Sequence, residues 1–329
     1  MLNQKRVLVP KSMDPEGVRL LEARADLQVT AYDPAIRTAD LHALLSDAAA
    51  IALSWTPFRA AEIAATPHLQ VVARLGVGFD AVDVPSLSVR HIPLMTAGTA
   101  NSRAVAEHAV HFIFALAKRA PELHHRVATG IGHDRKSPLP GEIAGKTVLI
   151  VGFGRIGTRT APRCKALEMH VLVHDPYVPA ETIRAAGYEP APDLDAALPH
   201  ADFITLHCPK TPETIGLFGA ARLARMKQGA FLINTARGGI VDEAALTVAL
   251  RSGHLGGAAL DVFDPEPPDP ANHLLHMENV LASPHLAGVT TEAWTAICVV
   301  AAENILSVLD GAPTVAHAVN PEAMIRPTN

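Results

Sequence analysis

Cysteine is scarce in this chain, which holds three in 329 residues. Cys164, Cys208 and Cys298 are far apart in the sequence, and none belongs to a Cys-x-x-Cys pair. A low and odd count argues against a disulfide framework and for a reducing compartment, so we expect the protein to be cytoplasmic.

Charge of one sign and long apolar runs are also lacking. The net charge of −5 comes from 28 basic and 33 acidic residues, which excludes a broadly basic nucleic-acid binder. No apolar run reaches the roughly 18 residues of a membrane span, and residues 1–10 lack the apolar core of a signal peptide. The 17 histidines show no zinc-ligand spacing. We therefore expect no metal, no membrane and no nucleic-acid partner.

Apolar residues, in contrast, are plentiful. They make up 49% of the chain, and its length predicts two domains. Short β-branched runs alternate with helical stretches, which is typical of the α/β class with parallel sheets and crossover helices. We expect strands at 6–9, 27–30, 48–53 and 69–73 in a first unit, and at 147–151, 169–173, 203–206, 230–233, 258–260 and 280–282 in a second.

Two long helices are also predicted. One begins at the cap residues Asn101 and Ser102 and ends before Pro121. It is apolar almost all round, which indicates burial on several sides, as at a domain or subunit interface. The other covers about 291–309, and Asp310 and Gly311 end it.

A glycine-rich loop, GFGRIG at 152–157, directly follows the buried strand 147–151 and opens a helix. In this context the motif indicates dinucleotide binding, although a glycine turn without a ligand is the alternative. Gly152 permits the tight turn, Gly154 lets the backbone approach a pyrophosphate, and Gly157 lets helix and strand pack closely. Arg155 and Ile156 complete the loop, and the helix N-terminus offers free N–H groups to the phosphate.

An acidic residue ends the next strand. Asp175 stands 18 residues after Gly157, where a carboxylate can accept both hydrogen bonds of an adenosine ribose diol. The same carboxylate repels a 2′-phosphate, and no arginine stands at 176–178 to bind one. The sequence therefore predicts NAD rather than NADP as the cofactor.

Three later strands are each followed by a charged or titratable residue: Arg237, Glu266 and His285. Ligands of open α/β sheets bind beyond the carboxyl ends of the strands. This set would suit a 2-oxo acid substrate. The arginine would bind the substrate carboxylate, the histidine would protonate its carbonyl, and the glutamate would tune the pKa of the histidine. From spacing alone, three unrelated loop residues remain the alternative.

Taken together, these segments resemble the D-isomer-specific 2-hydroxyacid dehydrogenases over nearly the whole chain. This family contains phosphoglycerate dehydrogenases, hydroxypyruvate and glyoxylate reductases and D-lactate dehydrogenases. The markers are RLGVGFD at 74–80, NSRAVAEH at 101–108, the glycine loop, HCP at 207–209, and the segments around Arg237, Glu266 and His285.

The resemblance implies two Rossmann-like domains with parallel sheets. The substrate domain would be discontinuous, with residues 1–99 and 288–329, and the NAD-binding domain would be inserted at 100–287. The family is usually a homodimer built on the cofactor domain, which agrees with the nearly all-apolar helix after Asn101.

The resemblance also implies roles for single residues. Arg237 resembles the arginine that binds the substrate, and Glu266 and His285 resemble the acid/base relay. Further expected substrate-binding residues are Arg74, Trp55, and Gly76 and Val77 as the carboxylate cradle. Asp261 resembles the residue that holds the nicotinamide carboxamide. Other expected cofactor-lining residues are Cys208, Pro209, Thr214, Thr235, Ala236 and Gly288.

Departures from the family bear on the substrate. Phosphoglycerate dehydrogenases typically carry Arg-Ser after the third strand, whereas this chain has Ser54 and Trp55. A phosphate-binding arginine is therefore missing there, although Arg74 remains. Lys210 stands where the family often has leucine, and His133 where it often has tryptophan. Glu266 speaks against a formate dehydrogenase, which has glutamine at this position.

The sequence thus predicts an NAD-dependent enzyme for a small 2-oxo acid and its D-2-hydroxy acid, with hydroxypyruvate or glyoxylate favoured. Alternatives are a phosphoglycerate dehydrogenase lacking its regulatory domain, since the chain stops at residue 329, and an enzyme oxidising an anion such as phosphite. An NAD-sensing corepressor with the same triad is a rival from another class.

Overall fold

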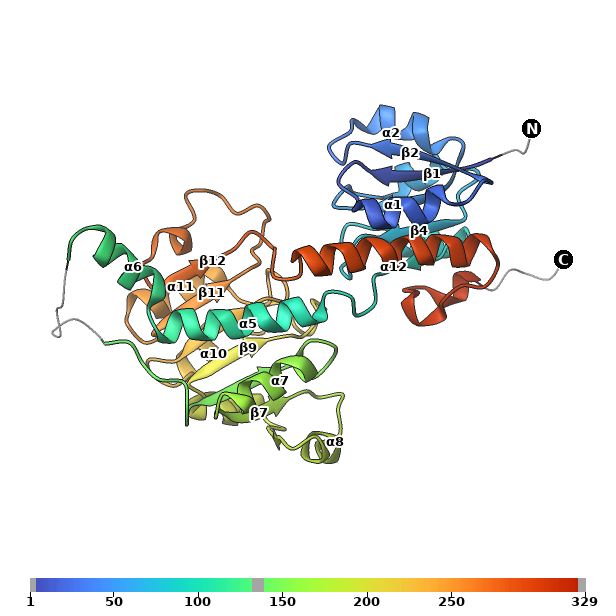
Figure 1. The fold of residues 1–329 in the computed structure, drawn as a ribbon. Coiled ribbons are helices and arrows are strands. Elements are labelled where there is room, and N and C mark those ends of the chain that lie inside the picture. Colours follow the sequence, from blue (N-terminus) through green and yellow to red (C-terminus); the bar gives the residue numbers. More distant parts are fainter. Residues whose placement is uncertain (1–3, 132–138, 325–329) are drawn as a thin grey trace. The chain divides into compact units, whose positions relative to one another are not determined.

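The computed structural model describes residues 4–131 and 139–324, so His133 lies outside the described residues. The chain forms two compact units. Unit 1 combines Met1–Asn101 with Val289–Asn329, and unit 2 is Ser102–Gly288. Unit 1 therefore joins the blue and red ends of the chain in Figure 1, whereas unit 2 takes the green to orange middle.

Unit 1 is built on a five-stranded sheet in the order β2-β1-β3-β4-β5, and its neighbouring strands run parallel. In chain order, its elements are β1 (Lys5–Pro10), α1 (Pro15–Glu22), β2 (Leu27–Tyr32), α2 (Thr38–Leu45), β3 (Ala48–Leu53), α3 (Ala60–Ala64), β4 (Val71–Arg74), α4 (Val84–Val89), β5 (Leu94–Met95), α12 (Thr291–Leu309), η3 (Val315–His317) and η4 (Pro321–Met324).

Helices cover both faces of this sheet. Val7 and Val9 of β1 pack in one apolar cluster with α1 and α12, because alternate strand residues point to opposite faces. Leu8 packs in the other cluster, with α2, α3 and α4. A sheet buried on both faces accounts for the continuous apolar strands in the sequence.

Helix α12 is, by length and composition, able to cross a membrane, and it is the one such helix in the described part of the chain. The search for unbroken apolar runs missed it because Glu303 and Asn304 interrupt the pattern. Ile297, Ala301 and Ile305 are buried against the sheet of unit 1. A core helix passes the same test, so the length of α12 is weak evidence for a membrane span.

Unit 2 is built on a seven-stranded sheet in the order β12-β11-β10-β9-β6-β7-β8, again with parallel neighbours. Its elements are α5 (Ser102–Ala117), α6 (Ala120–Ala128), β6 (Thr147–Val151), α7 (Gly157–Ala166), β7 (His170–His174), α8 (Ala180–Ala185), β8 (Glu189–Pro190), α9 (Leu194–Ala197), η1 (Leu198–His200), β9 (Phe203–Leu206), α10 (Ala220–Arg225), β10 (Phe231–Asn234), α11 (Glu243–Arg251), β11 (Gly257–Leu260), η2 (His273–His276) and β12 (Val280–Ala282).

This sheet also lies between two helical layers. Val148 and Ile150 of β6 pack with α5, α7 and α8, whereas Leu149 and Val151 pack with α9, α10 and α11. The chain passes from β6 to β7 on one side and then returns to β9 on the other. Such a reversal of strand order opens a crevice at the carboxyl ends of the strands, where ligands of this architecture bind.

The predicted α/β class with two parallel sheets is confirmed. Most expected strands are present within one or two residues, but the two-residue edge strands β5 and β8 were missed because they are too short to show a pattern. Helix α5 ends at Ala117, before Pro121, as expected, and Pro121 itself stands in the first turn of α6. Proline is tolerated there because that N–H has no intrahelical partner.

Candidate active site

The predicted chemistry-bearing residues of unit 2 follow the carboxyl ends of neighbouring strands. The glycine loop follows β6, Cys208 follows β9, and Arg237 follows β10. Glu266 follows β11 and His285 follows β12. Because all five strands run parallel in one sheet, their following loops belong to the same edge.

The glycine loop has the conformation and the space that a bound phosphate requires. Gly152 has φ +99°, and a Cβ there would lie 2.7 Å from the carbonyl carbon of His207, so glycine is needed at this position. Gly154 is exposed, and a Cβ there would meet no atom within 4 Å. The loop thus presents open space at its middle glycine, and α7 begins directly after it, at Gly157.

The flanks of the loop are Arg155, which is exposed, and Ile156, which is half-buried and caps α7. Asp175 is tied to the same loop. One of its carboxylate oxygens accepts a hydrogen bond of 2.7 Å from the backbone N–H of Phe153, and the other accepts one of 2.9 Å from Tyr177. The Tyr177 hydroxyl in turn donates to Glu213. Asp175 is therefore held at the end of β7 by the glycine loop, and Tyr177 connects it to Glu213.

Two buried polar atoms beside this edge have no hydrogen-bond partner among the described residues: Oγ1 of Thr235 and Nδ1 of His207. Burial lowers the pKa of His207 to about 3, so its ring is neutral. Buried polar groups are normally paired, so these two atoms are places for the polar groups of a ligand. With the open glycine loop, they fit a dinucleotide.

The other expected cofactor-lining residues lie in the same loops. Burial raises the pKa of the half-buried Cys208 thiol to about 11, and Ala236 is buried. The hydroxyl of Thr214 donates to the carbonyl of Pro209 at 2.6 Å, so this side chain closes the turn after β9. Gly288 is buried at the end of unit 2.

His285 and Glu266 form a hydrogen-bonded pair. Nδ1 of His285 lies 2.8 Å from one oxygen of Glu266, and the other oxygen accepts 2.9 Å from the N–H of Phe263. The hydrogen bond to Glu266 raises the pKa of His285, although burial opposes it. Burial alone would raise the pKa of Glu266, but the bonds from His285 and Phe263 outweigh it and lower that pKa. The pair therefore favours a carboxylate beside an imidazolium.

Arg237 acts on both members of this pair. Its charge helps to lower the pKa of Glu266 and works against the raised pKa of His285. Asn234 supports the arginine from the end of β10, since its amide donates to the carbonyl of Arg237 at 2.9 Å and its oxygen accepts from Ala236. The structure thus brings the three predicted catalytic residues together within unit 2.

Asp261 has more partners than the sequence indicated. It is 1% exposed, and its carboxylate accepts hydrogen bonds from Ser283 Oγ, Leu286 N at 2.9 Å and Ala287 N at 3.0 Å. Its backbone carbonyl accepts from His285 N at 2.8 Å. His285 has φ +56°, a left-handed conformation that costs a residue with a Cβ about 1–2 kcal/mol. Asp261 therefore stabilises the loop that carries His285. Its predicted contact with the nicotinamide carboxamide stays a prediction.

One further contact escaped sequence reasoning. Nε2 of His108, on α5, lies 3.1 Å from Oγ of Ser283. The marker NSRAVAEH ends at His108 but indicates only the family, and a histidine on an apolar helix usually packs in the core or at the surface. Only the fold brings α5 next to the loop after β12.

The four predicted substrate-binding residues belong to unit 1. Arg74, at the end of β4, donates to the carbonyls of Gly78 at 2.9 Å and Leu53 at 3.0 Å. Gly76 has φ +152°, which favours glycine, and its carbonyl accepts from Ala97 at 2.9 Å. Val77, next to it, is half-buried.

Trp55 is 63% exposed and lines a pocket of about 370 Å³ within unit 1. Apolar neighbours in that pocket include Ile36 and Leu41. Trp55 follows β3, the strand that pairs with β4. The loop after β3 thus carries an exposed aromatic side chain and no arginine at this position, as the sequence indicates.

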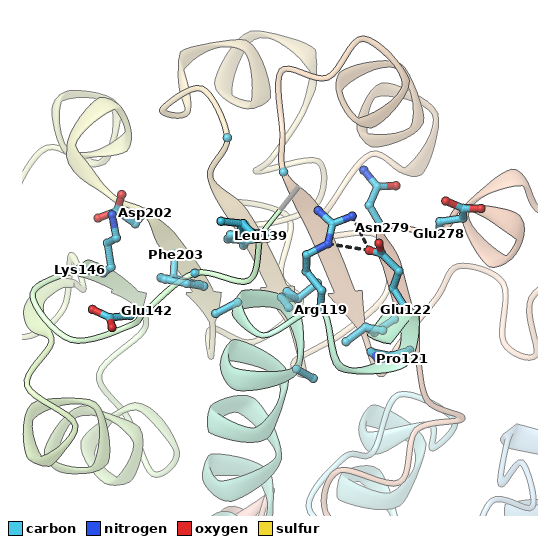
Figure 2. Close-up of a pocket in the computed structure, with 18 of the residues that line it drawn as sticks. Arg119, Pro121, Glu122, Leu139, Glu142, Lys146, Asp202, Phe203, Glu278 and Asn279 are labelled. Atoms are coloured by element: carbon cyan, nitrogen blue, oxygen red, sulfur yellow. Dashed lines mark hydrogen bonds and ion pairs between the residues drawn. The ribbon is translucent and has the colours of Figure 1, made fainter. Parts of the chain in front are cut away.

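A larger pocket, of about 670 Å³, lies at the opposite edge of the unit 2 sheet. It is lined by Phe203 and Phe231, the first residues of β9 and β10, and by Gly256 and Asn279, which precede β11 and β12. Figure 2 shows its charged rim, where Arg119 donates to Glu122 at 2.6 Å. This pocket is remote from the strand ends that carry Arg237, Glu266 and His285.

No group of three or more His, Cys, Asp or Glu side chains within residues 4–131 and 139–324 could hold a metal ion. Lys210, the departure from the family pattern, forms an ion pair of 2.8 Å with Asp264. Asp264 precedes Glu266 in the loop after β11, so Lys210 connects the loops after β9 and β11.

Comparison with known families agrees with this geometry. Residues 110–287 match the model of the D-isomer specific 2-hydroxyacid dehydrogenase NAD binding domain. The chain therefore belongs to the D-isomer specific 2-hydroxyacid dehydrogenase family, and most of unit 2 is its NAD-binding domain. The resemblance and the NAD cofactor expected from the sequence are confirmed.

Single relatives support this membership. A D-3-phosphoglycerate dehydrogenase of Archaeoglobus fulgidus is 41% identical over 83% of this chain and 51% of its own length. The chain thus spans about half the length of this curated relative and of similar ones. The crystal structure of D-lactate dehydrogenase from Aquifex aeolicus with NAD and lactic acid matches with TM-score 0.84 and 27% identity over 95% of this chain and 99% of that one.

A second solved structure bears on the choice of coenzyme. It is the NADPH-dependent glyoxylate/hydroxypyruvate reductase of Sinorhizobium meliloti in complex with NADP and malonate. It matches with TM-score 0.84 and 29% identity, over 99% of this chain and 100% of that one. Proteins of this fold thus include an NADPH-dependent reductase, so a preference for NAD depends on this chain's own residues and not on the fold.

Proposed function

We propose that the chain is an NAD-dependent oxidoreductase that interconverts a small 2-oxo acid and its D-2-hydroxy acid. The observation that carries this proposal is the pair of His285 and Glu266, with Nδ1 and carboxylate 2.8 Å apart and the charge of Arg237 acting on both. A titratable acid, its stabilising carboxylate and an arginine are what reduction of a 2-oxo acid requires. Unit 2 would be the NAD-binding domain, predicted as 100–287, and unit 1 the substrate domain, predicted as 1–99 and 288–329.

Each catalytic residue has a task in this reaction. NAD, when bound, supplies or accepts the hydride. His285 as imidazolium protonates the carbonyl oxygen during reduction and, as the neutral ring, removes the hydroxyl proton during oxidation. Glu266 orients the ring and stabilises its charged form, because a carboxylate beside an imidazolium favours the charge. Arg237 binds the substrate carboxylate and polarises the carbonyl.

The residues around the glycine loop would hold the cofactor. The pyrophosphate would lie at the glycines of this loop, Gly152, Gly154 and Gly157, next to the N-terminus of α7. Arg155 and Ile156 would flank it. Asp175 would accept the hydroxyl groups of the adenosine ribose. A 2′-phosphate at that place would meet the carboxylate of Asp175, which also accepts from the N–H of Tyr177. This carboxylate repels such a phosphate, which supports NAD over NADP.

The remaining polar atoms support the nicotinamide side. The unpartnered Thr235 hydroxyl would face the cofactor. The other residues expected to line the cofactor are Cys208, Pro209, Thr214, Ala236, Asp261 and Gly288. In unit 1, the backbone at Gly76 and Val77 would receive the substrate carboxylate, with Arg74 and Trp55 in the adjoining loops.

Unphosphorylated substrates such as hydroxypyruvate or glyoxylate fit these residues best. Two donors of Arg74 are engaged by the carbonyls of Gly78 and Leu53, and the loop after β3 offers Trp55 instead of a cation. The second candidate is a phosphoglycerate dehydrogenase, which the name of the Archaeoglobus relative favours. Comparing kcat/KM for hydroxypyruvate and 3-phosphohydroxypyruvate decides between them. Faster use of the phosphorylated substrate would establish the second candidate.

The direct test of the activity is a panel of 2-oxo acids with NADH, followed by NADH absorbance, and the corresponding D- and L-2-hydroxy acids with NAD. We expect turnover of a small 2-oxo acid and oxidation of the D-isomer alone. A chain that binds NADH but turns over no member of the panel would be a cofactor-sensing binding module instead.

We also propose a homodimer in the cytoplasm. Helix α6 buries none of its residues, and Leu123, Val127 and Ile131 are exposed on or just after it. Such an apolar surface suits a second copy. The three cysteines are free in the structure, as in a reducing compartment. Light scattering of the purified chain tests the dimer, and cell fractionation tests the compartment.

A further inference from the structure

We propose that His108 is a positioning residue for His285, which it fixes through Ser283 and Asp261. This inference rests on the proposed function, because it concerns the group that would transfer the proton. Its basis is a continuous chain of hydrogen bonds. His108 Nε2 lies 3.1 Å from Ser283 Oγ, and Ser283 Oγ bonds to Asp261, whose oxygens also accept from Leu286 N and Ala287 N.

The direction of this chain follows from the groups themselves. A carboxylate is an acceptor only, so the one hydroxyl proton of Ser283 goes to Asp261. Ser283 Oγ can then only accept from His108, which requires a proton on Nε2 of the ring. His108 is therefore a donor, either as the neutral Nε2–H tautomer or as imidazolium.

The arrangement differs from that of a serine nucleophile. In a hydrolytic triad the histidine takes the proton of the serine and a carboxylate orients the histidine. Here the serine donates to the carboxylate, and the histidine donates to the serine. Ser283 is thus held as a structural bridge between α5 and the loop after β12.

The loop gains a defined conformation from this bridge. His285 has φ +56°, and it is held there by bonds to Asp261 from its own N–H and from the next two residues. Ser283 is the first residue of the segment 283–287, whose members make these bonds. If its hydroxyl is left without the donor from α5, it can turn away, and the carboxylate that holds Leu286 and Ala287 loses a fixed partner.

The surroundings of His108 suit an anchor. Its ring meets Phe112 edge-on, with ring centres 4.3 Å apart, and burial lowers its pKa. The neighbouring His111 lies one turn away on the same helix but is exposed, with ring centres 5.8 Å apart. His111 is therefore a matched control on the same element.

The test compares three variants with the unmodified chain. His108→Leu removes the donor at similar size, His108→Gln keeps a side-chain N–H, and His111→Leu is the control. Two readouts are taken: steady-state kinetics of 2-oxo acid reduction, and amide hydrogen exchange of the 283–288 segment. Exchange needs no turnover, so it tests the anchor even if the proposed activity fails.

For His108→Leu we expect kcat to fall about tenfold, with the KM for NADH within about twofold, and faster exchange in the 283–288 segment. His108→Gln should keep most of the kcat and most of the exchange protection of the 283–288 segment, and His111→Leu should change neither quantity. If His108→Leu leaves both readouts unchanged, or if His108→Gln is as impaired as His108→Leu, the proposal is overturned. Should His108→Leu not fold, Ser283→Ala against Ser283→Thr provides the same comparison, with the same expected and contradicting outcomes.

Discussion

The two edges of the unit 2 sheet use charge in opposite ways. At the amino ends of the strands, a pocket of about 670 Å³ is rimmed by charges that pair with each other, such as Lys227 with Asp202 at 2.7 Å. At the carboxyl ends, Glu266 pairs with a titratable ring, His285, while Arg237 acts on both. Only the second arrangement sets the protonation of a group that can transfer a proton.

The comparison shows that pocket volume does not locate the chemistry in this fold. The amino edge, with the larger pocket, offers ion pairs between fixed charges, and such exposed pairs add little to the stability of the fold. The carboxyl edge offers a glycine loop and a strained histidine held by a buried aspartate. Strain is typical of functional sites, because stability alone does not account for it.

The largest effect should come from removing the acid at the carboxyl edge. For His285→Ala, we expect kcat for 2-oxo acid reduction to fall by about 10²–10⁴-fold, because the proton donor is lost. NADH binding, measured by fluorescence titration, should be nearly unchanged. His273→Ala, at an exposed histidine of the same unit, serves as the control. A comparable loss in both variants would mean that no specific acid has been identified.

A smaller effect is expected at the end of β7. Asp175→Asn keeps an acceptor for the N–H of Phe153 but removes the charge, so NADPH should be repelled less. We expect the ratio of kcat/KM for NADH over NADPH to fall by about tenfold, the equivalent of one lost charge-assisted hydrogen bond. Equal use of both coenzymes by the unmodified chain would refute the assigned role of Asp175.

The smallest effect is expected at the amino edge. Lys227→Met breaks a half-exposed ion pair with Asp202, and such pairs contribute about 0–1 kcal/mol. The free energy of unfolding should therefore change by less than about 1 kcal/mol, as measured by urea denaturation, and kcat should stay the same. A marked loss of activity would show that the amino edge takes part in the reaction and would break the comparison.

Much of this carboxyl edge was predictable from the sequence. Glu266 and His285 stand in loops that follow strands, and parallel strands bring such loops to one edge whatever the details of packing. The glycine loop was likewise predictable, because it stands between the strand at 147–151 and a helix. Most strands of both sheets are rich in apolar residues, so pattern alone located them within one or two residues, apart from the two-residue edge strands β5 and β8.

The rest depended on contacts between distant segments. His108 and Ser283 are 175 residues apart, and nothing in either local pattern indicates that they meet. The left-handed conformation of His285 is also hidden, because it is fixed by Asp261 and not by a glycine. Sequence patterns report burial and periodicity, whereas such hydrogen bonds depend on the tertiary arrangement.

The most direct test of the central claim is the pH dependence of catalysis in Glu266→Gln. Glu266 raises the pKa of His285, reduction needs the imidazolium and oxidation needs the neutral ring. Glutamine keeps a hydrogen-bonding side chain but removes the charge, so the pKa of His285 should fall. The alkaline limb of kcat/KM for reduction should then move to lower pH, and the acidic limb for oxidation should move to lower pH as well. If both limbs stay where they are in the unmodified chain, Glu266 does not tune His285 and the proposed relay is contradicted.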